Sequence, residues 1–376
     1  MITYPVSGMV NSISVISGTC NDWAGFAGGY SAGMSTSIAK VEIRVQDVTA
    51  GTTYWNGTSW SEVISTRACI TVNTALSSYT TWQYTESVGW VSDREYRVYV
   101  FGTDDIGNQG VIGAGYTIFY DTTPPTVGIE SPVDASKLNS VPVISGTANA
   151  LVSGLGDVRI YVSTWVGSSW VLGISSVAAN NIYQSSWSWT GLSGLSDGTT
   201  YQVVVKVRDN ANNWSMIYST RTFFYDITVP EVGIVRPSDE GFYGSSLGLS
   251  TISGTIAEQG SSGSGVSRVL VRISTGSGEP YSYWAPGSSS WEVGVSSWLV
   301  GSIGASYWTS ISTPMWQGGK EYRVEAQGYD VAGNTSTIVT NTFTYDTVLP
   351  QSGITVPNAR YLTSLGTISG TGVDVN

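Results

Sequence analysis

The sequence predicts an all-β protein made of tandem β-sandwich domains arranged end to end. Three observations predict it: a tetrapeptide that recurs at intervals of a domain length, apolar residues that alternate with period two, and a composition rich in glycine, serine and aromatic residues. Such a composition is typical of short strands joined by tight turns. No segment has a convincing helical period.

The tetrapeptide Ile-Ser-Gly-Thr occurs four times, and a proline-containing segment precedes each copy. The copies begin at Ile16, Ile144, Ile252 and Ile368. A second pattern recurs three times: a tryptophan, a tyrosine 14 residues later, an aspartate eight residues after the tyrosine and an asparagine four residues after the aspartate. Its copies are Trp82, Tyr96, Asp104 and Asn108, then Trp187, Tyr201, Asp209 and Asn213, then Trp308, Tyr322, Asp330 and Asn334. Repetition on this scale predicts that one structural unit is used several times.

Alternating apolar residues place strands inside each unit. One strand begins at each tyrosine of the second pattern and continues through apolar residues two positions apart: Val98 and Val100, Val203 and Val205, Val324 and Ala326. An earlier strand alternates in the same way: Val41, Ile43 and Val45, then Val158, Ile160 and Val162, then Val269, Val271 and Ile273. Side chains two apart on a strand share a face, so each set is predicted to face a core.

A Tyr-Asp pair and a proline-containing linker close each unit, at Asp121, Asp226 and Asp346. We therefore expect domains at residues 1–123, 124–228 and 229–348, and only the opening strands of a fourth domain at 349–376. A lone opening pair cannot bury its apolar face, so the sequence is interpreted as a window on a longer array. The linker prolines are expected to limit bending between domains.

The segments from Tyr322 to Ala326, from Asp330 to Asn334 and at Tyr345-Asp346 resemble bacterial Ig-like repeats. The tyrosine lies where immunoglobulin-type sandwiches have a tyrosine corner, near the start of strand F. The resemblance implies an immunoglobulin-like fold for each domain and an extracellular place on the cell surface, in a large surface protein or adhesin. It implies little about function, because such repeats serve as stalks, spacers and binding tips.

Composition excludes several kinds of chemistry. The chain has no histidine and only two cysteines, so neither a Ser-His-Asp or Cys-His nucleophile system nor a cysteine zinc site can form. The formal net charge of −11 argues against nucleic acid, whose phosphates need a basic footprint. No apolar run approaches the ~18 residues that span a membrane, so no membrane insertion of this segment is expected. These observations favour a protein that is not an enzyme.

Aspartates recur at the turns and linkers, and Ca²⁺ prefers oxygen ligands. The candidate calcium ligands are Asp104, Asp121, Asp209, Asp226, Asp330 and Asp346. The alternative is turn chemistry, in which Asp and Asn side chains accept or donate hydrogen bonds to nearby main-chain groups. Apart from this calcium, no cofactor is expected.

Aromatic residues in the first domain are candidates for binding a glycan or a surface protein. A glycine-rich insertion contains Trp23, Phe26 and Tyr30, and long loops on rigid scaffolds often carry binding sites. Trp55 and Trp60 flank a predicted hairpin turn. The alternative is that these rings pack on a neighbouring sheet or stabilise the hairpin across its two strands.

Cys20 and Cys69 both lie in the first domain, and we expect them to form a disulfide. An extracellular location makes the oxidised state reachable, and the alternative is two buried thiols that act as small apolar residues.

Two functions remain open at this point. The first is an extracellular structural protein that forms a stalk or fibre on the cell surface, with neighbouring repeats or other copies of the chain as partners and self-association into filaments. The alternative is an adhesin that binds a glycan or a partner protein through the aromatic loops of the first domain. A glycosidase with paired carboxylates is the least favoured, because most of the aspartates recur as turn and linker residues.

Overall fold

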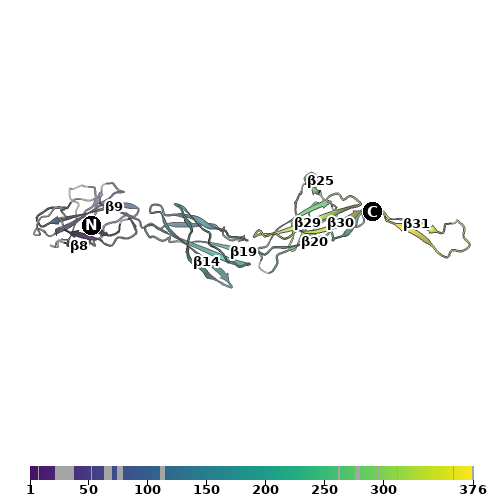
Figure 1. Cartoon of the computed structure of the whole chain (residues 1–376), viewed down its shortest axis with the longest axis horizontal. Coiled ribbons are helices and arrows are strands. Elements are labelled where there is room, and N and C mark those ends of the chain that lie inside the picture. Colours follow the sequence, from purple (N-terminus) through teal and green to yellow (C-terminus); the bar gives the residue numbers. More distant parts are fainter. Residues whose placement is uncertain are drawn as a thin grey trace, which may run out of the picture. The chain divides into compact units, whose positions relative to one another are not determined.

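The computed structural model describes residues 1–6, 8–21, 38–51, 53–62, 70–73, 79–110, 115–260, 263–275, 280–294, 296–310, 312–358 and 360–374. All regular elements in these residues are strands, which confirms the predicted all-β class (Figure 1). The same residues include no helix with the length and apolar character needed to cross a membrane. The chain divides into two compact units, Met1–Asp134 with Pro142–Ser193 and Gln202–Thr222, and Ala135–Val141 with Gly194–Tyr201 and Phe223–Asn376.

Two sheets form from the strands of the first predicted domain. The smaller sheet has the order β1 (Ile2–Tyr4), β3 (Ile16–Asn21), β8 (Tyr79–Tyr84). The larger sheet has the order β2 (Gly8–Val10), β10 (Tyr116–Tyr120), β9 (Arg94–Asp104), β4 (Ile38–Asp47), β5 (Thr53–Trp55), β6 (Trp60–Ser61), and β7 (Ile70–Asn73) also pairs with β4.

The second predicted domain repeats this plan. Its smaller sheet has the order β11 (Thr126–Ser131), β13 (Ile144–Asn149), β17 (Ser186–Trp189), β16 (Asn181–Ile182). Its larger sheet has the order β12 (Ser136–Leu138), β19 (Ser219–Tyr225), β18 (Thr199–Asp209), β14 (Leu155–Val166), β15 (Ser169–Ala178).

The third predicted domain follows the same plan with more strands. Its smaller sheet has the order β20 (Glu231–Arg236), β22 (Ser253–Ala257), β28 (Tyr307–Thr309), β27 (Ser302–Ile303). Its larger sheet has the order β21 (Gly241–Gly244), β30 (Val339–Asp346), β29 (Lys320–Asp330), β23 (Val266–Thr275), β24 (Ser282–Ala285), β25 (Ser290–Val293), and β26 (Leu299–Val300) pairs with β23.

The last strands of the chain form a two-stranded hairpin of β31 (Gln351–Val356) and β32 (Ser369–Val373). They pair as β11 pairs with β13 and β20 with β22, with a register shift at the same place beside the proline. Both strands are exposed along their whole length. Within the described residues each sheet draws its strands from one predicted domain, while the domain boundaries themselves remain a prediction.

The apolar sets predicted from alternation form the cores. The alternating residues of β4, β14 and β23 are buried, as are those that follow the tyrosine in β18 and β29, so these predictions are confirmed. The predicted tyrosine corner is also present. In each copy the tyrosine hydroxyl accepts a main-chain N–H from five residues upstream, at 2.8 Å: Tyr96 from Val91, Tyr201 from Ser196, and Tyr322 from Gln317.

The glycine of Ile-Ser-Gly-Thr is explained by the tryptophan that packs on it. Gly146 in β13 pairs with Trp187 in β17, and Trp187 is 1% exposed. A Cβ at Gly146 would lie 1.9 Å from the carbonyl oxygen of Gly128 and 2.8 Å from the Trp187 ring. Gly254 has the same environment, with 1.8 Å to the carbonyl oxygen of Gly233 and 2.5 Å to Trp308. Only a residue without a side chain fits there.

Gly146→Ala is expected to destabilise the second domain by about 3 kcal/mol, because the new methyl group must displace a strand backbone and a buried indole. Scanning calorimetry should show that one of the unfolding transitions occurs at a lower temperature than in the wild type. Gly173→Ala, on β15 of the same domain, is the matched control, since its Cβ would meet nothing closer than 3.6 Å. Equal melting of the two variants would contradict this account of the tetrapeptide.

Candidate functional site

Each of the three long strands that carry the tyrosine ends in the same aspartate–asparagine turn. The aspartate Oδ1 accepts the main-chain N–H of the asparagine four residues later, and the asparagine Nδ2 donates to the aspartate Oδ2. These distances lie between 2.7 and 2.8 Å in Asp104–Asn108, Asp209–Asn213 and Asp330–Asn334. This is the turn chemistry that stands as the alternative to calcium at these aspartates.

The asparagine also holds the linker aspartate that precedes its domain. Asn213 Nδ2 donates to the carbonyl oxygen of Asp121 at 2.8 Å, and Asn334 Nδ2 donates to that of Asp226 at 2.8 Å. Both amide hydrogens of each asparagine therefore have acceptors, one in its own turn and one in the linker. We call this pair of contacts the linker clasp.

The linker aspartates also cap the residues that follow them. Asp121 Oδ1 accepts the N–H of Thr123 at 2.8 Å, and Asp226 Oδ1 accepts that of Thr228 at 3.0 Å. Asp346 makes the same contact with the N–H of Val348. Asp121 and Asp226 are 2% and 1% exposed, so the clasp fixes a buried carboxylate at the start of each linker.

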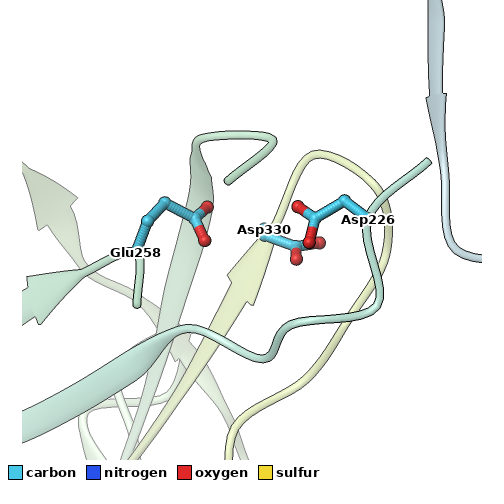
Figure 2. Close-up of side chains that lie close together, drawn as sticks. All are labelled: Asp226, Glu258 and Asp330. Atoms are coloured by element: carbon cyan, nitrogen blue, oxygen red, sulfur yellow. The ribbon is translucent and has the colours of Figure 1, made fainter. Parts of the chain in front are cut away.

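Three carboxylates converge at the linker that follows β19. Figure 2 shows the side chains of Asp226, Glu258 and Asp330 directed toward one another, and one oxygen from each lies within 4.8 Å of the others. Asp330 ends β29, Asp226 follows β19, and Glu258 follows β22. Among the described residues this is the one group of three acidic or metal-ligating side chains that lie so close.

Glu258 differs from the two aspartates in its surroundings. Asp226 Oδ2 accepts the N–H of Ser264 at 2.6 Å, and Asp330 Oδ1 accepts main-chain N–H groups of its own turn. Neither oxygen of Glu258 has a hydrogen-bond partner within the described part of the chain, although both are shielded from solvent.

The pKa of Glu258 is raised by burial first, and then by the negative charges of Asp330 and Asp226. The Gly265 amide and the Lys137 ammonium act in the opposite direction and do not cancel this rise. The cluster therefore holds more negative charge than its surroundings balance. Its donors are all oxygens, and oxygens 2.3–2.6 Å from one Ca²⁺ lie at most about 5 Å apart, so the group fits a calcium ion.

The cluster unites two of the six predicted calcium ligands, Asp226 and Asp330, with a residue that sequence reasoning missed. A signal for Glu258 was available, because it lies six residues after the tetrapeptide isoleucine. The same position holds Asp22 in the first copy and Asp374 in the fourth, but Ala150 in the second. The linker clasp that Asn213 makes with Asp121 and Asp209 therefore has no third carboxylate at this position.

The other four predicted ligands, Asp104, Asp121, Asp209 and Asp346, are not part of the cluster. Burial acts to raise the pKa of Asp104, but hydrogen bonds from Asn108, Ile106 and Gly107 outweigh it, and the pKa is lowered. Asp104 is thus stabilised as a carboxylate by its own turn.

The aromatic candidates of the first domain fall into two groups. Trp23, Phe26 and Tyr30 lie outside the described residues. Trp55 is 5% exposed and donates its indole N–H to the Tyr84 hydroxyl at 3.2 Å, while Trp60 donates to the Gly89 carbonyl oxygen at 2.7 Å. The two rings contact each other, with centroids 5.5 Å apart, and both pack on the core. Their binding role remains a hypothesis.

The expected disulfide also remains a prediction. Cys20 is half-buried at the end of β3, but Cys69 lies outside the described residues.

Residues 80–227 match the family of bacterial Ig-like domains (group 3). This match covers less than half of the chain, and that part is similar to the family. No curated protein sequence matches the chain.

Solved structures similar to this chain include two bacterial adhesins. A Ca²⁺-stabilized adhesin that helps an Antarctic bacterium bind ice is 14% identical with a TM-score of 0.30, over 91% of this chain and 73% of that one. A 1.5-MDa bacterial ice-binding adhesin is 16% identical with a TM-score of 0.29, over 89% and 90%. The fibronectin(III)-like modules of Clostridium thermocellum CbhA are 15% identical with a TM-score of 0.31, over 59% and 95%. Similarities this low carry no information on function.

Glu258→Gln should stabilise the third predicted domain at neutral pH when no calcium is present. Because the folded-state pKa of Glu258 is raised, the ionised carboxylate opposes folding above that pKa, and the penalty disappears as pH falls below the ordinary value of 4.5. Calorimetry in EDTA should therefore show a higher transition temperature for the variant at pH 7.5 and no difference near pH 4. Glu231→Gln, at an exposed position, is the control. If Glu258→Gln raised the transition temperature equally at both pH values, the ionised carboxylate would not be the cause.

Proposed function

We propose that this chain is part of an extracellular structural protein that forms a stalk or fibre on a bacterial surface, and that it has no enzymatic role. Its units would be residues 1–123, 124–228 and 229–348, with the opening strands of a further unit at 349–376. The repetition of one Ig-like plan supports this, because a stalk needs similar units in series. Neighbouring repeats and other copies of the chain are the partners that this role requires.

The observation that carries the proposal is the linker clasp with its carboxylate cluster. A stalk stays extended only if its joints resist bending, and the clasp ties the aspartate at the end of one unit to the turn that follows β29 of the next. Asn334 holds the main chain of Asp226, and the Asp226 carboxylate in turn accepts the N–H of Ser264. The linker is thus hydrogen-bonded to two separate segments of the third domain.

We further propose that Asp226, Glu258 and Asp330 bind Ca²⁺ and that the ion stiffens this joint. Burial and the charges of Asp330 and Asp226 together raise the Glu258 pKa, and the ion would offset both effects and supply a partner for the Glu258 oxygens. Extracellular modules typically bind calcium with dissociation constants of about 10⁻⁴ to 10⁻³ M. Such an affinity suits a site that is filled outside the cell and needs no dense acidic loop.

Calcium should raise the unfolding temperature of the third domain and leave that of the second unchanged. At about ten times the dissociation constant, the expected stabilisation is about 1.4 kcal/mol. Glu258→Gln should abolish the shift, Asp209→Asn should not alter it, and Ala150→Glu should create a calcium-dependent shift in the second domain. Calorimetry in about 5 mM CaCl₂ and in EDTA makes the comparison. A calcium shift that survives in Glu258→Gln would refute the assignment.

Small-angle scattering tests the stalk itself. If the units are arranged end to end, each about 40 Å long at ~3.3 Å per strand residue, the largest dimension should be on the order of 120 Å or more. Calcium should narrow the distribution of end-to-end lengths of the wild type but not that of the Glu258→Gln variant. A compact, globular profile in both conditions would contradict a stalk.

A further inference from the structure

The second Ig-like domain carries a groove on the outward face of its larger sheet. Alternate residues of β18 fill the core, so Val204, Lys206 and Arg208 face outward between them. The groove is open to solvent and has a volume of about 340 Å³. Its lining residues come from β14, β15, β18 and the segment before β19: Tyr161, Ser163, Leu172, Val204, Lys206 and Tyr218.

Aromatic rings surround a single ammonium group in this groove. Lys206 Nζ lies 4.4 Å from the ring centroid of Trp214, 5.6 Å from that of Tyr161 and 5.9 Å from that of Tyr218. The Arg208 guanidinium lies 5.5 Å from the Trp214 ring. Trp214 and Tyr218 are 38% and 55% exposed, so ring surface beyond these contacts is available to a ligand.

Positive charge exceeds negative charge on this face, although the whole chain carries −11. Asp157 is shared by Arg159, at 2.7 Å, and Arg208, at 3.8 Å. Lys206 forms no ion pair with any described residue, and residues 115–260 around it are described without a gap. β14 and β18 thus present three outward cations and one outward carboxylate, which favours an anionic ligand.

A bulge brings a hydroxyl pair to the same place. The pairing of β14 with β15 shifts register near Tyr161, and Ser176 in β15 has a φ of 56°. Bulges of this kind re-aim a side chain. The pKa of the Tyr161 hydroxyl is lowered, first by its hydrogen bond with Ser176 and further by Lys206, against the opposing effect of burial. Polar groups and aromatic faces therefore meet in one groove.

We propose that this groove binds an acidic polysaccharide, with a uronate carboxylate on Lys206 and sugar rings stacked on Tyr218 and Trp214. A sugar ring offers an apolar C–H face to an aromatic ring and keeps its hydroxyls in water, which suits an open groove. The inference does not depend on calcium or on the stalk.

The third domain provides a matched control for the cation. Its Arg272 guanidinium lies 4.5 Å from the Trp298 ring centroid and 5.0 Å from that of Tyr283. Unlike Lys206, it pairs with a carboxylate, since Arg272 Nε lies 2.7 Å from Glu325 Oε2. The residue in the position of Lys206, five after the tyrosine, is Gln327 there. Arg272 thus has aromatic contacts like those of Lys206, but its own charge is balanced by Glu325.

The test is affinity electrophoresis of the whole chain in gels that contain polygalacturonate, with calorimetric titration by tetragalacturonate, both in EDTA. Polygalacturonate should retard the wild type and neutral dextran should not. Lys206→Gln and Tyr218→Ala should each weaken the apparent affinity by about fivefold, as expected for one exposed charge or ring contact. Arg272→Gln should bind as the wild type does, and the unfolding temperature of Lys206→Gln should be unchanged.

Several outcomes would overturn the proposal. One is an absence of retardation by polygalacturonate at low salt, and another is an equal loss of affinity in Lys206→Gln and Arg272→Gln. Equal retardation by dextran would show that charge plays no part. If polyglutamate competes at equal concentration with the same dependence on Lys206, the groove binds acidic protein segments instead. Binding by single-stranded DNA with that dependence would likewise rule out a polysaccharide site.

Discussion

The tryptophan of the smaller sheet lies against the glycine of the neighbouring strand in all three predicted domains, and the packing of that sheet depends on this contact. In the second and third domains the indole N–H also donates to a main-chain carbonyl oxygen, of Thr147 at 3.2 Å and of Gly233 at 3.0 Å. Trp308 thus connects β28 with β22 by packing and with β20 by a polar bond, whereas both contacts of Trp187 are made with β13. Because the ring needs the space that a Cβ would occupy, the glycine is fixed, and the flanking isoleucine is then directed into the core.

Much of the fold could be predicted because burial leaves a periodic record in the sequence. Val158, Ile160 and Val162 alternate with polar residues, and the same spacing recurs in the other units, so both the strand and its inward face were evident. The tyrosine corner was also predictable, since its partner is a main-chain N–H only five residues away. Local geometry and local sequence carry the same information in such cases.

The candidate site was less accessible to sequence reasoning. Asp226 and Asp330 were predicted from their recurrence, but Glu258 was missed because its neighbours are brought to it by folding and lie far away in the sequence. The second hydrogen of Asn334 reaches the linker for the same reason. Lys206 looks like an ordinary solvated strand residue, and only the fold places Trp214 and Tyr218 around its ammonium group. Long-range proximity of single, non-repeating residues has no periodic signature.

The residue six positions after the tetrapeptide isoleucine differs between otherwise similar units, with Ala150 in one and Glu258 in another. The clasp itself is the same in both, so the difference affects neither the core nor the strand order. A single substitution at this position would therefore alter the electrostatics of one joint and leave the mechanics of its neighbours unchanged. If the proposed ion site stiffens its joint, the identity of this one residue would decide which joints respond to the ionic composition around the molecule and which do not.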